Sequence, residues 1–242
     1  DQAALLAAGV LAVEVFRKPR VLIIPTGDEI VRPEEAPSPL PPGTLLEVNG
    51  QMLASLAAEC GAEARIRAIV PDRPGELAAA LGEALAGPFD LILLIAGSSA
   101  GSEDFTPSLL EGLGELLVHG ITVMPGKPAL LAAAAGKPVV GVPGYPVSAA
   151  VAFREFARPL IYLMQGLAPP PFERVEVALG RKLPSKLGLE EQVRTIIGRV
   201  GDRAVAMPIA GGAGVITSLV KADGIVRIPQ EADGLAEGAT AF

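Results

Sequence analysis

The amino-acid sequence predicts an α/β protein with a doubly wound, mostly parallel sheet, followed by a small C-terminal β domain. Short β-branched apolar runs, of the kind that is buried on both faces of a parallel sheet, alternate with helical patterns. A second indication is the change of composition after Pro169–Pro171. We therefore expect an α/β domain over residues 1–168 and a small β-barrel-like domain over residues 169–242.

The first part of the chain alternates strands and helices, as a doubly wound sheet requires. An Ala- and Leu-rich helical pattern and a short apolar run precede the first central strand, Arg20–Pro25, which contains the β-branched run Val21–Ile24. A proline-rich stretch at 32–43 must cross the surface, because proline disrupts helices and central strands. The next expected elements are a helix over 50–60 capped by Asn49, a strand over 64–70, a helix over 75–86 and a buried strand over 90–96.

The second part begins with a helix over 107–113 and two short strands over 120–124 and 138–142. Pro146 suits a first helical turn and opens the longest predicted helix, which runs to about Gly166. Beyond the prolines, short β-branched runs separated by glycine predict a small antiparallel sheet or barrel. Its expected strands are 175–179, 194–200, 203–208, 215–220 and 224–229.

Composition excludes several classes of function. The formal net charge of -7 argues against a general nucleic-acid binder, because such binding relies on Lys and Arg neutralising phosphates. A single cysteine, Cys60, excludes an internal disulfide framework and a cysteine-rich metal site, and we expect it to be buried on a helix face. No apolar run has the length of a membrane span and no leader pattern is present, so we expect a cytoplasmic protein with no membrane partner.

Four unusual loops follow predicted strands, and the carboxyl ends of parallel strands share one edge of a sheet. Glycine lets backbone N–H groups approach an oxyanion, hydroxyl side chains add donors, and a helix N-terminus adds a positive dipole end. Lys127 is the obvious cationic partner. The pattern matches neither a Walker P-loop nor a dinucleotide fingerprint, and it predicts a shared anion site. The loops are Thr26–Glu29, Ala96–Asp104, Pro125–Pro128 and Pro143–Ser148.

Carboxylates also gather at the predicted strand ends. Beside a phosphate they are repulsive unless a cation bridges them, and Mg²⁺ can do so with one or two carboxylates. The alternative, that each one merely caps a following helix, stays open. The lone His119 receives no role, and Tyr145 could stack on a planar ligand or simply pack. The carboxylates are Asp28, Glu29, Asp72, Glu103 and Asp104.

At these loops the sequence resembles the family of molybdopterin molybdotransferases that includes MoeA and the gephyrin E domain. The stretch Gly211–Ile225 is similar to the C-terminal β domain of that family. The motifs that carry the resemblance are Pro19–Val21, Thr26–Glu29, Asn49, Gly97–Thr106, Pro125–Pro128 and Pro143–Ser148.

The resemblance implies the molybdenum-cofactor biosynthesis fold. It further implies binding of molybdopterin or its adenylylated form at the carboxyl edge of the sheet, insertion of molybdate into the dithiolene and release of AMP. Glu29, Asp72 and Asp104 would be the catalytic and Mg²⁺-binding positions. The expected ligand-binding residues are Thr26, Gly27, Asp28, Gly97, Ser98, Ser99, Gly101, Ser102, Lys127, Pro143, Gly144, Tyr145 and Ser148.

The sequence departs from the family pattern in three respects. The usual Gly-Gly-Val-Ser-Val-Gly loop is Ala96–Gly101 here, and the usual Pro-Gly-Asn-Pro contains Tyr145 in place of Asn. These variants resemble a subgroup in which the MoeA-like region is fused to a periplasmic-binding-protein-like domain of the LysR-substrate type. The two N-terminal domains of the family have no counterpart in the sequence, so we expect a truncated form. We also expect a homodimer.

The sequence therefore leaves several functions open. One is a molybdotransferase domain, and another is a non-catalytic module that senses or holds a molybdopterin compound. A third is a scaffold in which the long helix Pro146–Leu163 supports a homodimer without a ligand. The adenylyltransferase branch of the fold is a weaker alternative, because the β domain after Pro171 indicates the MoeA branch.

Overall fold

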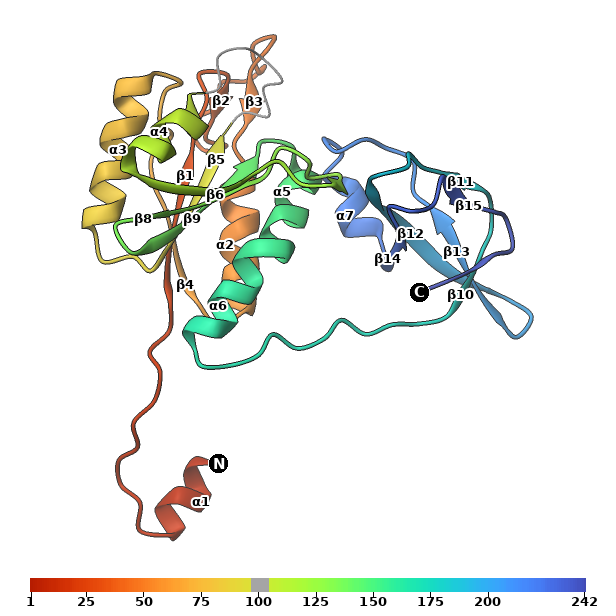
Figure 1. Ribbon diagram of the computed structural model, residues 1–242, viewed down its shortest axis with the longest axis horizontal. Coiled ribbons are helices and arrows are strands. Elements are labelled where there is room, and N and C mark those ends of the chain that lie inside the picture. Colours follow the sequence, from red (N-terminus) through yellow and green to blue (C-terminus); the bar gives the residue numbers. More distant parts are fainter. Residues whose placement is uncertain (97–104) are drawn as a thin grey trace.

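The chain folds into two bodies joined by a linker, with an N-terminal arm that stands apart (Figure 1). The structure is a computed structural model and describes residues 1–96 and 105–242. The first body carries a six-stranded sheet in which five strands run in one direction and only the fifth in sheet order runs against its two neighbours. This confirms the predicted mostly parallel sheet. In sheet order the strands are β4 (Glu63–Ile66), β1 (Arg20–Pro25), β5 (Leu91–Ala96), β9 (Lys137–Pro143), β8 (Leu130–Ala134) and β6 (Gly114–His119).

Helices cover both faces of this sheet, so the predicted doubly wound architecture is confirmed (Figure 1). Successive side chains of a strand point to opposite faces. Ile23 and Leu93 accordingly pack with the helices of one face, and Ile24 and Leu94 with those of the other. The first face carries α2 (Asn49–Glu59), α5 (Pro146–Ala152), the π-helix η1 (Phe153–Ala157) and α6 (Arg158–Met164), and the second carries α3 (Pro74–Ala86) and α4 (Thr106–Leu113).

The strand order reverses between β1 and β5. The chain leaves β1 through α2 to reach β4 on one side, and α3 then brings it back to β5 on the other side of β1. In open α/β sheets such a reversal leaves a crevice beyond the carboxyl ends of the two strands, and ligands bind there.

The second body is a small sheet with its own apolar core, which includes Val177, Leu179, Val226 and Ile228. β10 (Val177–Leu179) and β13 (Arg203–Pro208) pair in parallel and the other pairs along the sheet are antiparallel, so the predicted antiparallel sheet is wrong in one pair. In sheet order the strands are β14 (Gly224–Ile228), β12 (Glu190–Val200), β13 (Arg203–Pro208), β10 (Val177–Leu179) and β16 (Thr240–Ala241), with β11 (Leu183–Pro184) and β15 (Gly234–Leu235) pairing separately.

Several predicted elements differ in the structure. The strand expected at 215–220 is wrong, because this segment forms turn hydrogen bonds and the helix α7 (Thr217–Lys221). The strand expected at 64–70 ends at Ile66, and only Val70 returns to form a bridge with Thr26. The run 120–124 contributes β7 (Val123–Met124), which pairs with β12 of the second body instead of the main sheet. The proline-rich crossing is flanked by β2 (Ile30–Val31) and β3 (Leu45–Leu46), a two-stranded parallel ribbon.

The N-terminal arm packs little against the rest of the chain. Its helix α1 (Gln2–Ala7) has no buried residue. Arg17 ties the end of the arm to Asp90 through an ion pair that has a side-chain hydrogen bond of 2.6 Å, and this contact lowers the pKa of the Asp90 carboxyl. None of the helices in the described part of the chain combines the length and the apolar character that a membrane span requires.

Candidate functional site at the carboxyl edge of the sheet

Three parallel strands end in register at one edge of the sheet. Pro25 of β1 lies opposite Ile95 of β5, and Ala96 of β5 lies opposite Pro143 of β9. The loops that follow β1 and β9 therefore leave the same edge, which puts Gly27 and Gly144 on one rim. The predicted site residues Gly97, Ser98, Ser99, Gly101, Ser102 and Asp104 lie outside the described residues.

The loop after β1 is held by hydrogen bonds within the protein. The buried Thr26 hydroxyl donates to the Ile95 carbonyl at 2.9 Å, and the Gly27 N–H donates to the Val70 carbonyl at 3.1 Å. Gly27 has a φ of 141°, and a Cβ built there would stand 2.7 Å from an oxygen of Glu29. The Thr26 hydroxyl proton is thus already used, while the Glu29 carboxylate lies close over Gly27.

Three of the predicted acidic residues lie at this rim. Asp28 and Glu29 are exposed, and Asp72 is exposed two residues after Val70, whose bridge to Thr26 places it at the same edge. Within residues 1–96 and 105–242, no group of three or more His, Cys, Asp or Glu side chains could hold a metal ion.

Asn49 fixes the loop that follows β9. Its side-chain nitrogen donates to the Gly144 carbonyl at 2.6 Å, and Asn49 is only 8% exposed. The predicted cap role is wrong: the side chain of Glu47 accepts from the Gly50 N–H at 2.7 Å, while Asn49 itself is the first helical residue. The Asn49 oxygen is buried and has no partner in the described part of the chain.

The start of α5 is where the two bodies meet at this rim. The Val147 N–H donates to the Ala213 carbonyl at 3.0 Å, and Ser148 is buried beneath it. The Tyr145 ring is 54% exposed, and one of its carbons lies 3.5 Å from the position of a Cβ built on Gly214. The Gly211–Gly214 loop of the second body thus stands beside the rim, although the sequence pattern did not assign it to the site.

Arg194 of β12 anchors the Gly211–Gly214 loop by a hydrogen bond. It is 7% exposed and donates to the Gly211 carbonyl at 2.7 Å, while burial lowers the pKa of its guanidinium. No sequence pattern indicates this role, because Arg194 lies within a strand pattern like any other polar residue.

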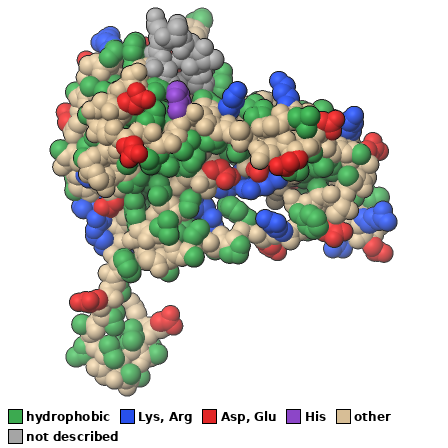
Figure 2. Space-filling model, in the orientation of Figure 1, with side chains coloured by type: hydrophobic (Ala, Val, Ile, Leu, Met, Phe, Trp, Pro, Cys, Tyr) green, Lys and Arg blue, Asp and Glu red, His purple; other side chains and the backbone are tan. Residues whose placement is uncertain are grey.

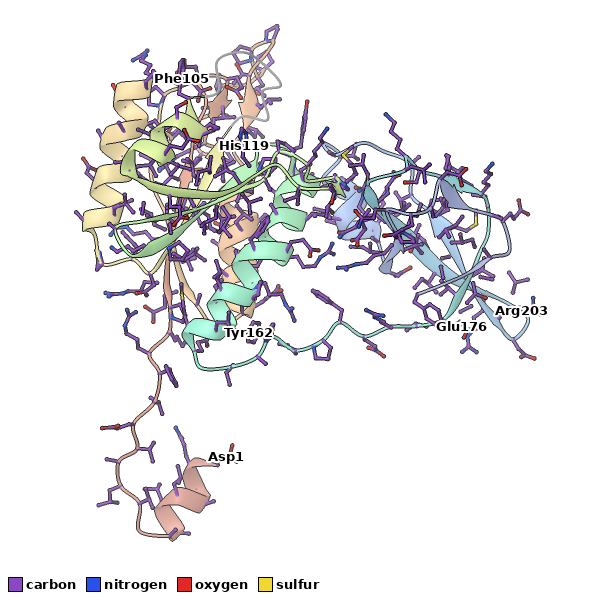
Figure 3. The ribbon with its side chains drawn as sticks, in the orientation of Figure 1. Asp1, Phe105, His119, Tyr162, Glu176 and Arg203 are labelled. Atoms are coloured by element: carbon purple, nitrogen blue, oxygen red, sulfur yellow. The ribbon has the colours of Figure 1, made fainter. Side chains whose placement is uncertain are left out.

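Lys127 lies in a tight turn packed against α5. The Ile121 N–H donates to the Lys127 carbonyl at 2.8 Å, and the buried Gly126 approaches α5 so closely that a Cβ there would stand 3.1 Å from the Val151 side chain. Lys127 itself is exposed. His119 is exposed at the end of β6 and receives no role (Figure 3).

The assembled rim can hold an anion next to a planar group. Its glycine turns are anchored from both bodies, it exposes Tyr145, and the exposed Lys127 follows Gly126, which packs against α5. These features define an α/β ligand-binding domain with its site at the topological switch of the sheet. The Thr26–Glu29 and Pro143–Ser148 motifs share that rim.

Comparison with known families identifies the domain. Residues 22–162, more than half of the chain, match the family described as "Probable molybdopterin binding domain", and residues 176–241 match the MoeA C-terminal region, domain IV. The chain therefore belongs to the MoeA family of molybdopterin-binding proteins.

Relatives support this assignment over most of the chain. A molybdopterin biosynthesis protein of Methanocaldococcus jannaschii is 33% identical over 89% of this chain and 52% of the relative. The molybdopterin molybdenumtransferase of Haemophilus influenzae is 28% identical over 98% of this chain and 58% of its own length. A molybdopterin biosynthesis MoeA protein of Pyrococcus horikoshii has a TM-score of 0.82 at 35% identity, covering 99% of this chain and 57% of that one. The chain thus spans a little over half the length of these relatives.

Proposed function

We propose that this chain binds molybdopterin or its adenylylated form at the rim formed by the β1 and β9 loops, and that it takes part in inserting molybdate into the dithiolene with release of AMP. The observation that carries the proposal is the common edge of Gly27 and Gly144, where the strand order reverses. The names of its relatives, molybdopterin molybdenumtransferases, support the same reaction.

The protein's part in such a reaction is positioning and neutralisation of charge, since the metal binds to sulfur atoms of the ligand. Glycine N–H groups and Lys127 would hold the phosphates. Glu29, Asp72 and Asp104 would serve the reaction and bind Mg²⁺, which one or two carboxylates together with waters can hold. The remaining proposed ligand contacts are the sequence-predicted ones: Thr26, Asp28, Gly97, Ser98, Ser99, Gly101, Ser102, Pro143, Tyr145 and Ser148.

Calorimetric titration with adenylylated molybdopterin, with and without Mg²⁺ and molybdate, tests the proposal. Release of AMP on addition of molybdate supports the transferase. Tight binding without release supports a module that only binds or senses the ligand, which the altered loop with Tyr145 in place of the usual asparagine permits. Absence of any binding heat contradicts both.

Lys127→Ala should weaken binding of the phosphorylated pterin by about tenfold, equivalent to about 1.4 kcal/mol, because one charged contact to phosphate is lost. The melting temperature should change little, since Lys127 is exposed. The matched control is Lys186→Ala, an exposed lysine of the second body that should leave both quantities unchanged. A marked fall in melting temperature would instead give Lys127 a structural role.

Tyr145 should stack on the pterin, and the composition of the chain allows a direct measurement. The chain has two tyrosines and no tryptophan, so Tyr162→Phe leaves Tyr145 as the only strong emitter. Its fluorescence should fall on binding of the pterin, because stacked aromatic rings interact closely. Tyr145→Phe, which leaves Tyr162 on α6 (Figure 3), corrects for light absorbed by the ligand. Equal decreases in the two variants would show that Tyr145 only packs against Gly214.

The proposal also covers the domain organisation, the location and the assembly of the chain. It includes a boundary between domains at residues 168 and 169, a cytoplasmic location, a homodimer and membership of the subgroup fused to a LysR-type periplasmic-binding-like domain. Light scattering of the purified chain tests the homodimer, and limited proteolysis tests the boundary within the exposed linker.

A further inference from the structure

A cavity lies between the two bodies, away from the strand ends. Its volume is about 760 Å³, and it is lined by η1, by the linker after α6 and by strands of the second body. Figure 2 shows acidic and basic side chains along the opening between the bodies. Arg154 lies eight residues after the first residue of α5, which is about 12 Å along a helix at 1.5 Å per residue. The cavity is therefore separate from the rim at the helix start.

Three arginines from three segments face this cavity, together with one glutamate, Glu173. Arg154 comes from η1, Arg174 from the linker and Arg227 from β14. Such an excess of basic side chains is notable in a chain of net charge -7. Pockets between domains that combine apolar walls with a few polar groups are the common form of small-molecule sites, with volumes of roughly 300–1,000 Å³.

Arg154 is only partly satisfied by the protein. Its side chain is 19% exposed, its Nη2 donates to the Gln192 side chain, and its Nε lies 3.5 Å from an oxygen of Glu155. Its Nη1 has no hydrogen-bond partner in the described part of the chain, yet it is not sealed from solvent. Burial lowers the pKa of Arg154, as expected for a cation with too little compensating charge.

Glu155 cannot neutralise Arg154 alone, because it is shared. The same carboxylate oxygen lies 3.3 Å from Arg227 and accepts from the Gln192 amide at 3.1 Å. Arg227 lies 3.7 Å from Glu190 as well. Two guanidinium groups therefore converge on one cavity with donors to spare, and planar guanidinium pairs suit carboxylate and phosphate oxygens.

The rest of the wall is apolar. Ile225 and Leu235 line it from the second body, and Phe172 lines it from the linker. The Phe172 ring already receives the guanidinium of Arg158 at 4.3 Å from its centroid and that of Arg154 at 5.7 Å. A ligand with an anionic head and an apolar body would thus find both kinds of surface.

We propose that this cavity binds a small organic anion, with its phosphate or carboxylate group on Arg154 and Arg227 and its apolar or aromatic part against Ile225, Leu235 and Phe172. Such a ligand touches both bodies and the linker, so its binding stabilises their relative position. The site is independent of the proposed pterin function.

Titration with phenyl phosphate and with inorganic phosphate tests the site, in the Lys127→Ala background to reduce binding at the strand ends. Phenyl phosphate should bind at least about tenfold more tightly than inorganic phosphate, because the ring buries apolar surface. Arg154→Gln and Arg227→Gln should each weaken it by about tenfold or more. The matched control is Arg203→Gln, at the end of the second body remote from the α/β domain (Figure 3), which should change nothing.

Two results would contradict the proposed cavity site. Absence of phenyl phosphate binding, or equal affinity in the Arg227→Gln variant and the Arg203→Gln control, overturns the proposal. Arg227 is 43% exposed, so its replacement should preserve the fold, and circular dichroism checks this for each variant. Binding of adenylylated molybdopterin should be unchanged by Arg227→Gln with Lys127 in place, which separates failure of this site from failure of the proposed function.

Discussion

Leu93→Ala is expected to lower the free energy of unfolding by about 2–5 kcal/mol, the usual cost of emptying a fully buried leucine site. Leu93 is 0% exposed in the middle of β5, the strand that lies between β1 and β9. Its side chain packs in the same core cluster as Ile23 and Val140, so both neighbouring strands lose a contact. Urea denaturation followed by circular dichroism measures the change.

The matched control is Leu163→Ala on α6, where the side chain is 64% exposed. Its effect should stay within about 0.5 kcal/mol, as for other surface replacements. If the two variants proved equally stable, Leu93 would not belong to a tightly packed core. Because β5 also sets the distance between the β1 and β9 loops, Leu93→Ala should weaken pterin binding even where the variant remains folded.

The central sheet could be predicted because its signal is local. Val21–Ile24 and Leu91–Ile95 are continuous apolar runs bounded by polar or turn residues, and only burial on both faces suits such runs. The common rim then follows from the strand direction alone, since the carboxyl ends of parallel strands lie at the same edge of a sheet. That is why Gly27 and Gly144, far apart in sequence, could be expected to lie together.

The antiparallel edge and the contacts between bodies could not be predicted in this way. β8 is a stretch of leucine and alanine whose pattern fits a strand or a loop, and only pairing with β9 decides it. The pairing of β7 with β12 and the hydrogen bond from Val147 to Ala213 join segments remote in sequence. Such contacts form only when the two folded domains pack together, so the hydrophobic periodicity of the sequence does not predict them.

Asn49 shows how a local rule can give the wrong role for a residue that matters. Asparagine ahead of a helical pattern is a common cap, so the sequence predicts a bond to its own helix. In the structure Glu47 makes that local bond, and Asn49 reaches across to the Gly144 carbonyl. The long-range partner was available only because α2 and α5 pack side by side on one face of the sheet.

Asn49→Ala is therefore expected to affect the site as well as the fold. Loss of the bond leaves the Gly144 carbonyl without its donor, which costs about 1–3 kcal/mol, and removal of the buried, unpartnered Asn49 oxygen offsets part of this. The loop that carries Tyr145 and Ser148 then loses one of its two anchors. Affinity for adenylylated molybdopterin should fall by about tenfold or more, because misplaced contacts lose most of their value.

Two further variants distinguish the loss of the Asn49 amide donor from the loss of side-chain volume. Asn49→Asp keeps the shape but places a carboxylate against the Gly144 carbonyl, so it should bind the pterin no better than Asn49→Ala, and be less stable. Gln51→Ala, on the same helix with an exposed amide side chain, should match the parent chain in both measurements. If Asn49→Asp retained full affinity, the hydrogen bond to Gly144 could not be what positions the loop, and the tether would lie in the contact between Val147 and Ala213.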